Sequence, residues 1–305
     1  MRILLVLNKK SGRSDEAGPQ RWAKILSELG TVTSIQPDKS ELDAMVDAAA
    51  GEADLVVAAG GDGTVNRCVN AARDHLRRIQ LGVIPMGTGN DFARTLGLPL
   101  DDPEDAARVI VEGSPRRVDL GQARGSGVER LFVNACIGGF PVHVDEAVSG
   151  SLKRLLGPLA YVAAGVKAAT TLSASTVTMN GQRVHDCVAA GVGNGRTCGG
   201  GITVWPDAEP DDGLLEGCAM PASNAAKAVE LGARVKGGNH LQLEGVRTAR
   251  SRTVRIESDP PMEFNVDGEL VGLTAPAEFR ARGRLTVVGP RDVTGRRLAR
   301  RGRGS

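Results

Sequence analysis

The chain has 305 residues, of which 41% are hydrophobic and 24% are charged, and its formal net charge is +2. This length allows two hydrophobic cores, because a single core rarely grows beyond about 250–300 residues. The nearly balanced charge favours no highly charged partner. Five scattered cysteines without a C-x-x-C pair argue against a disulfide framework or a zinc site and fit a reducing cytosol. No apolar run reaches the roughly 18–20 residues of a membrane span, so we expect any membrane contact to be peripheral.

The first 120 residues alternate short apolar runs with amphipathic segments. We expect strands at 2–7, 31–35, 54–59, 81–84 and 117–121, and helices at about 16–29, 40–50 and 103–112. This β-α-β order is typical of a parallel sheet with helices on both faces. Ligands of such sheets bind beyond the carboxyl ends of the strands, so the turns that follow the strands are the candidate sites.

The turn after the apolar run 55–59 carries the strongest functional signal. Residues 60–66 read Gly-Gly-Asp-Gly-Thr-Val-Asn and lead into a helix-compatible segment. The glycines leave room for a ligand to approach the backbone, and N–H groups at the start of a helix favour an anion such as phosphate. Asp62 fits a phosphate site only if a cation or a network of donors lies between its carboxylate and the phosphates. The alternative is an ordinary tight turn.

Two further polar loops are expected at the same edge of the sheet. Residues 8–12, Asn-Lys-Lys-Ser-Gly, follow the first strand, and residues 85–94, Pro-Met-Gly-Thr-Gly-Asn-Asp-Phe-Ala-Arg, follow the strand 81–84. In the second of these loops, Asn90 or Asp91 can cap a helix. Taken alone this segment is also compatible with an ordinary capped turn. Two Gly/Thr/Asp-rich loops at one edge favour a binding site.

Beyond about residue 122 the pattern changes to short strands separated by turns. Strand-like segments lie at 130–136, 174–179, 183–193, 215–220, 252–257, 262–266, 276–281 and 284–288. They predict a mostly antiparallel second domain. A helix expected at about 144–170 has a wide apolar arc, which indicates either a core-packed helix or a lipid-facing or substrate-covering element.

The chain therefore divides into three expected parts, an α/β domain at 1–122, a β-rich domain at 123–290 and a basic tail at 291–305. The tail contains six arginines. It fits either a solvated, disordered end or a segment that binds anionic lipid. No aromatic residue is interleaved with the arginines, which argues against a nucleic-acid arm.

Together these motifs resemble the diacylglycerol, sphingosine and ceramide lipid kinase family, in its bacterial soluble diacylglycerol-kinase-like branch. The resemblance keeps its order along nearly the whole chain, at 8–12, 60–66, 85–94, 118–121, 193–195, 199–201, 206–208, 211–214 and 266–269. Nicotinamide-nucleotide kinases and phosphofructokinases are similar to this chain at residues 60–66, the phosphate loop, as well. The segment 88–94 and the late Asp-Gly-Glu at 267–269 therefore favour the lipid kinases. No Walker A sequence and no G-x-G-x-x-G at a strand end is present, which removes support for P-loop and Rossmann cofactor sites.

The resemblance implies a phosphofructokinase/NAD-kinase-like α/β domain with a parallel sheet, followed by a mostly antiparallel β-sandwich. It implies an ATP-dependent kinase acting on the hydroxyl of a lipid alcohol, first of all diacylglycerol to give phosphatidic acid. ATP and Mg²⁺ would be the cofactors. Such an enzyme would be cytoplasmic, would contact a membrane surface transiently and would bind no nucleic acid. A homodimer is possible.

The same resemblance assigns roles to individual residues. Those implied to contact ATP are Asn8, Ser11, Gly12, Gly60, Gly61, Asp62, Gly63, Thr64, Val65, Asn66, Arg67 and Thr88. Those implied to hold Mg²⁺ are Asp62, Asp91 and Asp119 at a catalytic site, and Glu209, Asp212 and Leu214 at a structural site. Asp267 or Glu269 would accept the proton of the lipid hydroxyl, which is the task of a positioned carboxylate in phosphoryl transfer.

Some points stay open at this stage. Residues 138–145 read Gly-Gly-Phe-Pro-Val-His-Val-Asp, whereas family members usually have an aspartate sooner after the Gly-x-Gly-Phe segment, so Asp145 substitutes for it or the acceptor pocket differs. Asp267 and Glu269 would share one face of a strand, unless Gly268 makes a turn, and Asp-Gly is also a hairpin signal. A kinase for a soluble acceptor and a non-catalytic nucleotide-sensing protein are the alternative functions.

Overall fold

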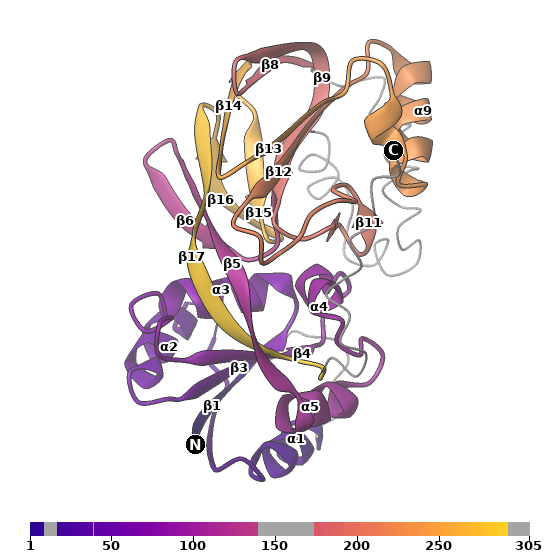
Figure 1. Ribbon diagram of the computed structural model, residues 1–305. Helices are drawn as coiled ribbons and strands as arrows, with labels where there is room; N and C mark the ends of the chain where they lie inside the picture. Colours follow the sequence, from indigo (N-terminus) through magenta and orange to yellow (C-terminus); the bar gives the residue numbers. More distant parts are fainter. Residues whose placement is uncertain (9–16, 39, 140–173, 292–305) are drawn as a thin grey trace.

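The computed structural model describes residues 1–8, 17–38, 40–139 and 174–291. The predicted helix at 144–170 and the tail after Arg291 lie outside these ranges. Figure 1 shows two stacked parts, with the N-terminal half of the chain in the lower one and the C-terminal half in the upper one. Within the described ranges, no helix is long and apolar enough to cross a membrane.

The lower part is a parallel sheet covered by helices on both faces. Its elements are β1 (Arg2–Leu7), α1 (Gly18–Leu26), β2 (Thr31–Ile35), α2 (Leu42–Ala50), β3 (Leu55–Gly60), α3 (Asp62–Ala71), β4 (Gln80–Pro85), α4 (Asp91–Leu96) and α5 (Pro103–Glu112). The strand order is β2-β1-β3-β4, and all three pairings are parallel. All six residues of β3 are buried, as expected for a central strand with a core on each side. Residues of α2 and α3 contribute to one of these cores, and residues of α1 and α5 contribute to the other.

The upper part is built from antiparallel strands. They are β6 (Val128–Phe132), β7 (Ala135–Gly139), β8 (Ser175–Met179), β9 (Gln182–Gly193), β12 (Leu215–Pro221), β13 (Arg247–Ser251), β14 (Thr253–Asp259), β15 (Glu263–Val266) and β16 (Glu269–Thr274). A small hairpin of β10 (Thr197–Cys198) and β11 (Ile202–Thr203), the helix α9 (Ala225–Lys236) and the 3-10 turn η1 (His240–Gln242) complete it. The predicted fold class, a parallel α/β domain followed by an antiparallel β-sandwich-like domain, is confirmed.

Two long strands join the parts. β5 (Ser114–Gly125) and β17 (Ala277–Gly289) pair with each other over almost their whole length and run side by side from the lower part into the upper part. β17 also pairs with β14 above and, in parallel, with β4 below. Leu285 and Val287 are fully buried in the core of the parallel sheet, although they come from the end of the described chain.

The strand predictions differ from the structure where elements split, merge or were not expected. The segment expected at 130–136 is divided between β6 and β7, and β13 and β16 were not predicted. The segments expected at 276–281 and 284–288 form the single strand β17, with a register shift between Ala281 and Arg284 and a positive φ of 77° at Gly283. The boundary expected at residue 122 falls inside β5. The helix α9 was not among the predicted elements, although Ala228, Leu231 and Val235 face the core at helical spacing.

Candidate active site

Glycines bring the first and second loops of the parallel sheet together. β3 ends at Gly60 and α3 begins at Asp62, with Gly61 between them in an extended conformation. A Cβ atom added to Gly60 would lie 2.4 Å from the Thr64 hydroxyl oxygen. That oxygen accepts a hydrogen bond of 2.8 Å from the Asn8 side chain. Asn8 and Thr64 are therefore neighbours, although 56 positions separate them.

The start of α3 has fewer free amides than its sequence suggests. The N–H groups of Thr64 and Val65 both donate to the Gly61 carbonyl oxygen, at 2.9 and 3.1 Å. An anion at this helix start would therefore meet the N–H groups of Asp62 and Gly63. Two amides and a nearby hydroxyl are thus the groups that a phosphate would meet at this helix start.

The third loop, between β4 and α4, touches the second one through glycine. Asn90 has a positive φ of 53°, and its side chain bonds both the N–H and the carbonyl oxygen of Gly87, at 2.9 and 2.8 Å. A Cβ atom on Gly87 would lie 2.6 Å from the Gly61 Cα. Only glycine permits this backbone contact, which holds the two loops in a fixed relation.

The carboxylates of Asp62 and Asp91 meet at this junction. Asp62 accepts hydrogen bonds from the backbone N–H groups of Asp91 and Phe92, at 3.0 and 2.9 Å. Asp91 accepts them from Gly200 and Gly201 of the β10–β11 turn, both at 2.8 Å. Burial, and then the neighbouring charge of Asp91, raise the pKa of Asp62 to about 6. Among the described residues, neither carboxylate forms an ion pair with a lysine or an arginine.

Asp267 lies at the centre of a network between the two parts of the molecule. Its side chain accepts four hydrogen bonds, from the Asn66 amide at 2.9 Å and from the N–H groups of Val133, Asn134 and Ala135 at 2.7, 3.0 and 2.8 Å. The residue is 5% exposed and has a positive φ of 47°. Burial raises the pKa of Asp267, and these hydrogen bonds oppose the increase. Both oxygens are thus engaged in joining α3 to the second part of the chain.

Glu269, two residues later, lies on the phosphate loop. A Cβ atom added to Gly63 would lie 2.4 Å from the Glu269 Oε1 atom, and one added to Gly268 would lie 3.9 Å from the Asp62 Cβ. Asp267 and Gly268 form the turn of the β15–β16 hairpin, so the two carboxylates do not share a strand face. The turn places Glu269 beside Gly63, and Gly268 near Asp62.

Asp119 belongs to a different cluster. Its carboxylate accepts hydrogen bonds from the Gly213 N–H group at 2.5 Å and from Arg284 Nε at 3.2 Å. Burial raises the pKa of Asp119, Gly213 and Arg284 lower it, and Asp212 is the neighbouring acid. In the part of the chain that the structure describes, no three His, Cys, Asp or Glu residues are arranged to hold a metal ion. Of the three aspartates expected in a water-linked network around Mg²⁺, Asp62 and Asp91 are neighbours, whereas Asp119 bonds Gly213 and Arg284. The network stays a prediction.

An arginine contacts the aspartate at which the resemblance implies a structural metal ion. Arg250 donates to the Asp212 carboxylate at 2.5 Å and lies 3.2 Å from the Glu216 carboxylate. The other oxygen of Asp212 accepts the Leu214 N–H group at 2.9 Å. Arg250 is thus a cationic partner of Asp212 and Glu216, with Asp207 and Glu209 as further neighbouring acids of Glu216. The structural Mg²⁺ site, Asp212 with the backbone carbonyl groups of Glu209 and Leu214, stays a prediction.

The remaining residues expected to bind nucleotide lie in different surroundings. Thr88 is exposed in the third loop. Arg67 forms an ion pair of 3.1 Å with Asp43 of α2. Val65 is buried in the core and Asn66 is fully buried at the Asp267 network, so either would meet a nucleotide only through its backbone. Ser11 and Gly12 lie outside the described residues, as does Asp145.

Two buried asparagines hold the site together and were not predicted to do so. Asn134 accepts the Thr95 hydroxyl at 2.9 Å and donates to the Thr197 carbonyl oxygen at 2.8 Å. Asn194 donates to the carbonyl oxygen of Asp119 at 3.0 Å. No local pattern marks Asn134. Asn194 lies in the Gly-Asn-Gly of 193–195, which the resemblance indicated without assigning a role to the side chain.

Comparison with known proteins agrees with this geometry. Residues 2–123 match the diacylglycerol kinase catalytic domain, and residues 135–289 match the YegS C-terminal NAD kinase beta sandwich-like domain. A "Probable lipid kinase YegS-like" protein of Xanthomonas oryzae pv. oryzae is 34% identical over 276 residues, which cover 87% of this chain and 88% of the relative. The chain belongs to the diacylglycerol-kinase-like family of lipid kinases.

Two further relatives match this lipid kinase along nearly its whole length. The "Diacylglycerol kinase" of Bacillus subtilis is 31% identical over 287 residues, covering 91% of this chain and 92% of that one. The crystal structure of a diacylglycerol kinase from Bacillus anthracis superposes with a TM-score of 0.70, at 23% identity, covering 94% of this chain and 96% of that one. The second match supports the fold, and the sequence relatives confirm the predicted kinase.

Proposed function

We propose that this lipid kinase transfers the γ-phosphoryl group of ATP to the hydroxyl group of diacylglycerol, giving phosphatidic acid. The observation that carries the proposal is the contact of the Glu269 carboxylate with Gly63, in the glycine loop after β3. A carboxylate of the second domain therefore lies at the loop where we propose that the first domain binds the phosphates of ATP. The name of the Bacillus subtilis relative supports diacylglycerol as the acceptor.

ATP would bind at the edge of the parallel sheet. The N–H groups of Asp62 and Gly63 would donate to phosphate oxygens, and the bonded pair of Asn8 and Thr64 would line the same loop. We assign the nucleotide to residues 1–122 and the lipid to residues 123–290. Because diacylglycerol resides in membranes, the enzyme would work in the cytoplasm and contact a membrane surface transiently.

Mg²⁺ fits beside Asp62 and Asp91. The two carboxylates are adjacent, have no described cationic partner, and the charge of one raises the pKa of the other. Mg²⁺ is commonly bound by one or two carboxylates together with substrate phosphates, without an all-protein cage. When bound, it would neutralise charge on the phosphates that the loop holds. Asp119 would orient the neighbouring backbone, since its N–H and carboxylate are bonded to the segment 210–213.

Of the two candidate bases, Glu269 is the one we assign to the lipid hydroxyl. Asp267 uses both of its oxygens for hydrogen bonds to protein donors. Glu269 lies at the phosphate loop, where a hydroxyl group attacking the γ-phosphate would need to lose its proton.

The test is a phosphorylation assay with labelled ATP and a panel of acceptors: diacylglycerol, ceramide, sphingosine, phosphatidylglycerol, an isoprenoid alcohol and glycerol. We expect labelled phosphatidic acid from the wild-type enzyme. Labelling of another lipid in place of diacylglycerol would overturn the acceptor assignment, and labelling of glycerol alone would overturn a lipid acceptor altogether.

A further inference from the structure

A cavity lined by four arginines lies where β5, β14 and β17 adjoin, apart from the candidate active site. Its volume is about 260 Å³, and its lining residues are Gln122, Arg124, Arg252, Arg280, Ala281 and Arg282. Sites that enclose a drug-sized ligand usually measure about 300–1,000 Å³. This cavity therefore suits a smaller group.

Strand pairing explains why these side chains gather. Arg280 of β17 lies directly opposite Gln122 of β5, so their side chains point to the same face. Arg124 follows Gln122 by two positions in the same strand and shares that face. Arg252 is the residue between β13 and β14, and its carbonyl oxygen accepts the Ala281 N–H group at 2.9 Å.

Carboxylates balance only part of this charge. Glu129 pairs with Arg124 at 2.8 Å and lies 4.0 Å from Arg282, and it also pairs with Arg73 at 3.1 Å. Arg252 and Arg280 have no ion-pair partner among the described residues. Guanidinium groups this close repel one another, and an anion between them would remove the repulsion.

Gln122 supplies the second, independent observation. The residue is 2% exposed, and its side chain lies beside Glu129, whose pKa it lowers as a hydrogen-bond donor, while its Nε2 atom reaches no acceptor at full hydrogen-bond geometry in the described structure. Buried donors without acceptors are rare in folded proteins. A donor that lines a cavity among arginines is suited to an anion with several acceptor oxygens.

The cavity and the phosphate loop lie at opposite ends of α3. Asp62 begins this helix, and Arg73, which shares Glu129 with the cavity, follows its last turn. At 1.5 Å per residue, the helix from Asp62 to Ala71 is about 14 Å long, and Arg73 lies beyond its end. A ligand in the cavity would therefore be separate from the nucleotide.

We propose that this cavity is a second phosphate-binding site, which takes the phosphate of a small phosphomonoester or of a lipid headgroup. Guanidinium groups bind phosphate through paired, charge-assisted hydrogen bonds, and the Gln122 amide adds a neutral donor. The inference does not depend on the acceptor or the base proposed above.

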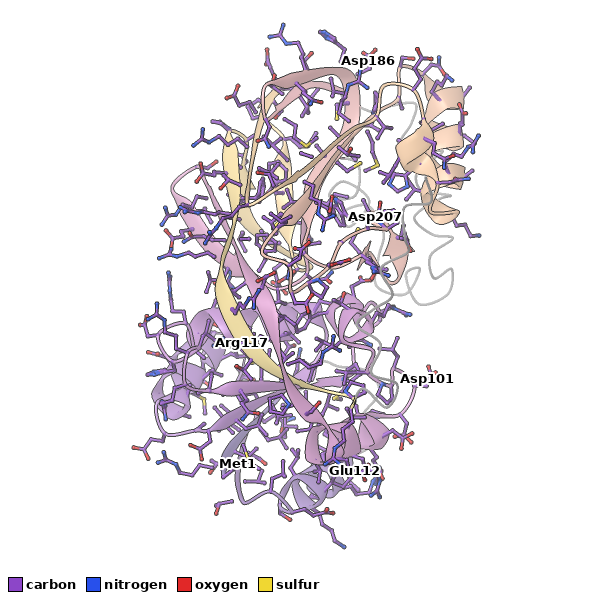
Figure 2. The ribbon with its side chains drawn as sticks, viewed as in Figure 1. Met1, Asp101, Glu112, Arg117, Asp186 and Asp207 are labelled. Atoms are coloured by element: carbon purple, nitrogen blue, oxygen red, sulfur yellow. The ribbon has the colours of Figure 1, made fainter. Side chains whose placement is uncertain are left out.

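The first experiment measures binding of inorganic phosphate and of glycerol 3-phosphate to the full chain by calorimetry. Wild type is compared with Arg252→Ala/Arg280→Ala and with a charge-matched control, Arg77→Ala/Arg183→Ala. Both control arginines are exposed and neither lines the cavity. Arg183 precedes Asp186, which Figure 2 places at the far tip of the second part of the molecule.

A second arm measures co-sedimentation of the same proteins with phosphatidylcholine vesicles, with and without phosphatidic acid. We expect the cavity variant to lose about tenfold or more in affinity for at least one phosphate source, and the control to stay within about twofold of wild type. Loss in the first arm identifies a soluble phosphate compound, and loss in the vesicle arm alone identifies a lipid headgroup.

A third variant separates a built site from general charge attraction. Gln122→Met keeps every charge and removes only the buried donor, so we expect it to weaken binding several-fold. Thermal melts verify that each variant is folded, and the arginine variant decides the matter if Gln122→Met does not fold. Equal binding by the cavity variant and the control in both arms would overturn the proposal.

Discussion

Asp267 and Glu269 stand two positions apart in the sequence, yet their carboxylates have different surroundings. Asp267 is buried and accepts four hydrogen bonds that link the two parts of the molecule. Glu269 is half-buried and lies against Gly63. One carboxylate is therefore placed to hold the fold, and the other to meet the substrate.

We predict that Glu269→Gln lowers kcat by about 10²–10⁴-fold with little change in stability, because an amide cannot accept the hydroxyl proton. Glu263→Gln, in the same hairpin, is the matched control and should keep wild-type kcat. Steady-state kinetics and urea unfolding of each variant provide the measurement. Wild-type kcat in Glu269→Gln would show that another group is the base.

Asp267→Asn should act on stability instead. In the wild type, both carboxylate oxygens accept hydrogen bonds from N–H donors. In the variant, the amide NH₂ group replaces one of these acceptors and faces those donors, so we expect the free energy of unfolding to fall by about 2–4 kcal/mol. Urea unfolding measures this change. A variant with unchanged stability but greatly reduced kcat would assign Asp267 to the reaction.

His240 makes the stability depend on pH in a defined direction. It is fully buried, its Nε2 atom lies 2.9 Å from the Val204 carbonyl oxygen, and its Nδ1 atom has no partner among the described residues. Burial lowers the pKa of His240 below 6.5, more than the Val204 hydrogen bond raises it. The unfolded chain therefore binds a proton at a higher pH than the folded chain does.

Linkage then requires the free energy of unfolding to fall as the pH drops below about 6.5, and to level off below the folded-state pKa. Buried acids with raised pKa values act in the opposite direction, so the effect is measured by difference. We predict that His240→Gln, which keeps an amide donor for Val204 but does not titrate, loses less stability than wild type between pH 7 and pH 5. If the free energy of unfolding changed equally with pH in the two proteins, the prediction would be contradicted.

The helix α3 connects the nucleotide loop to the rest of the molecule. Its first turn carries Asp62 and Gly63, its middle carries the buried Asn66, and its apolar face enters the core of the parallel sheet. A change at the start of this helix should therefore affect the reaction more than the fold.

Gly63→Ala tests this point against a glycine in another helix. The new Cβ atom would lie 2.4 Å from the Glu269 Oε1 atom, so the carboxylate must move away, and we expect kcat to fall by about tenfold or more. Gly232 of α9 has no atom within 4 Å of an added Cβ. Gly232→Ala should keep kcat and raise the free energy of unfolding by about 0.5–1 kcal/mol through helix propensity. Equal kinetics for the two variants would show that Glu269 does not act at this loop.

The whole molecule is connected by the β5–β17 pair. Leu285 and Val287 fill the core of the parallel sheet, while Phe279 and Ala281 of the same strand fill the core of the antiparallel part. Separate domains commonly unfold in separate steps. Here one strand contributes to both cores, so neither core is complete without the other part of the chain.

We therefore predict a single cooperative unfolding transition. The chain has two tryptophans, with Trp22 buried in the first domain and Trp205 buried in the second. Trp22→Phe keeps only Trp205, so its fluorescence reports the second domain, and Trp205→Phe keeps only Trp22 and reports the first. For each variant, the denaturant midpoint seen by fluorescence is compared with the midpoint seen by circular dichroism of the same variant. Coincident fluorescence and circular dichroism transitions are expected, and Leu285→Ala should lower the stability seen by both probes by about 2–5 kcal/mol. Two separate transitions would contradict the prediction.

The sequence by itself determined the parallel sheet and the loops at its edge. β3 consists of apolar residues that are buried on both faces, and Gly60 at its end leaves room for the side chain of Thr64, four residues later. Such features depend on local backbone conformation and on hydrophobic periodicity, which neighbouring residues encode.

Only the tertiary structure decided which distant side chains share the site. Asn66 and Asp267 are 201 positions apart and form a hydrogen bond, and Arg250 takes the carboxylate of Asp212 where the sequence suggested a metal ion. An apolar pattern shows that a strand is buried, but it does not show which strand lies beside it. The pairing of β17 with both β4 and β5 is long-range, and it is this pairing that joins the cores of the two parts.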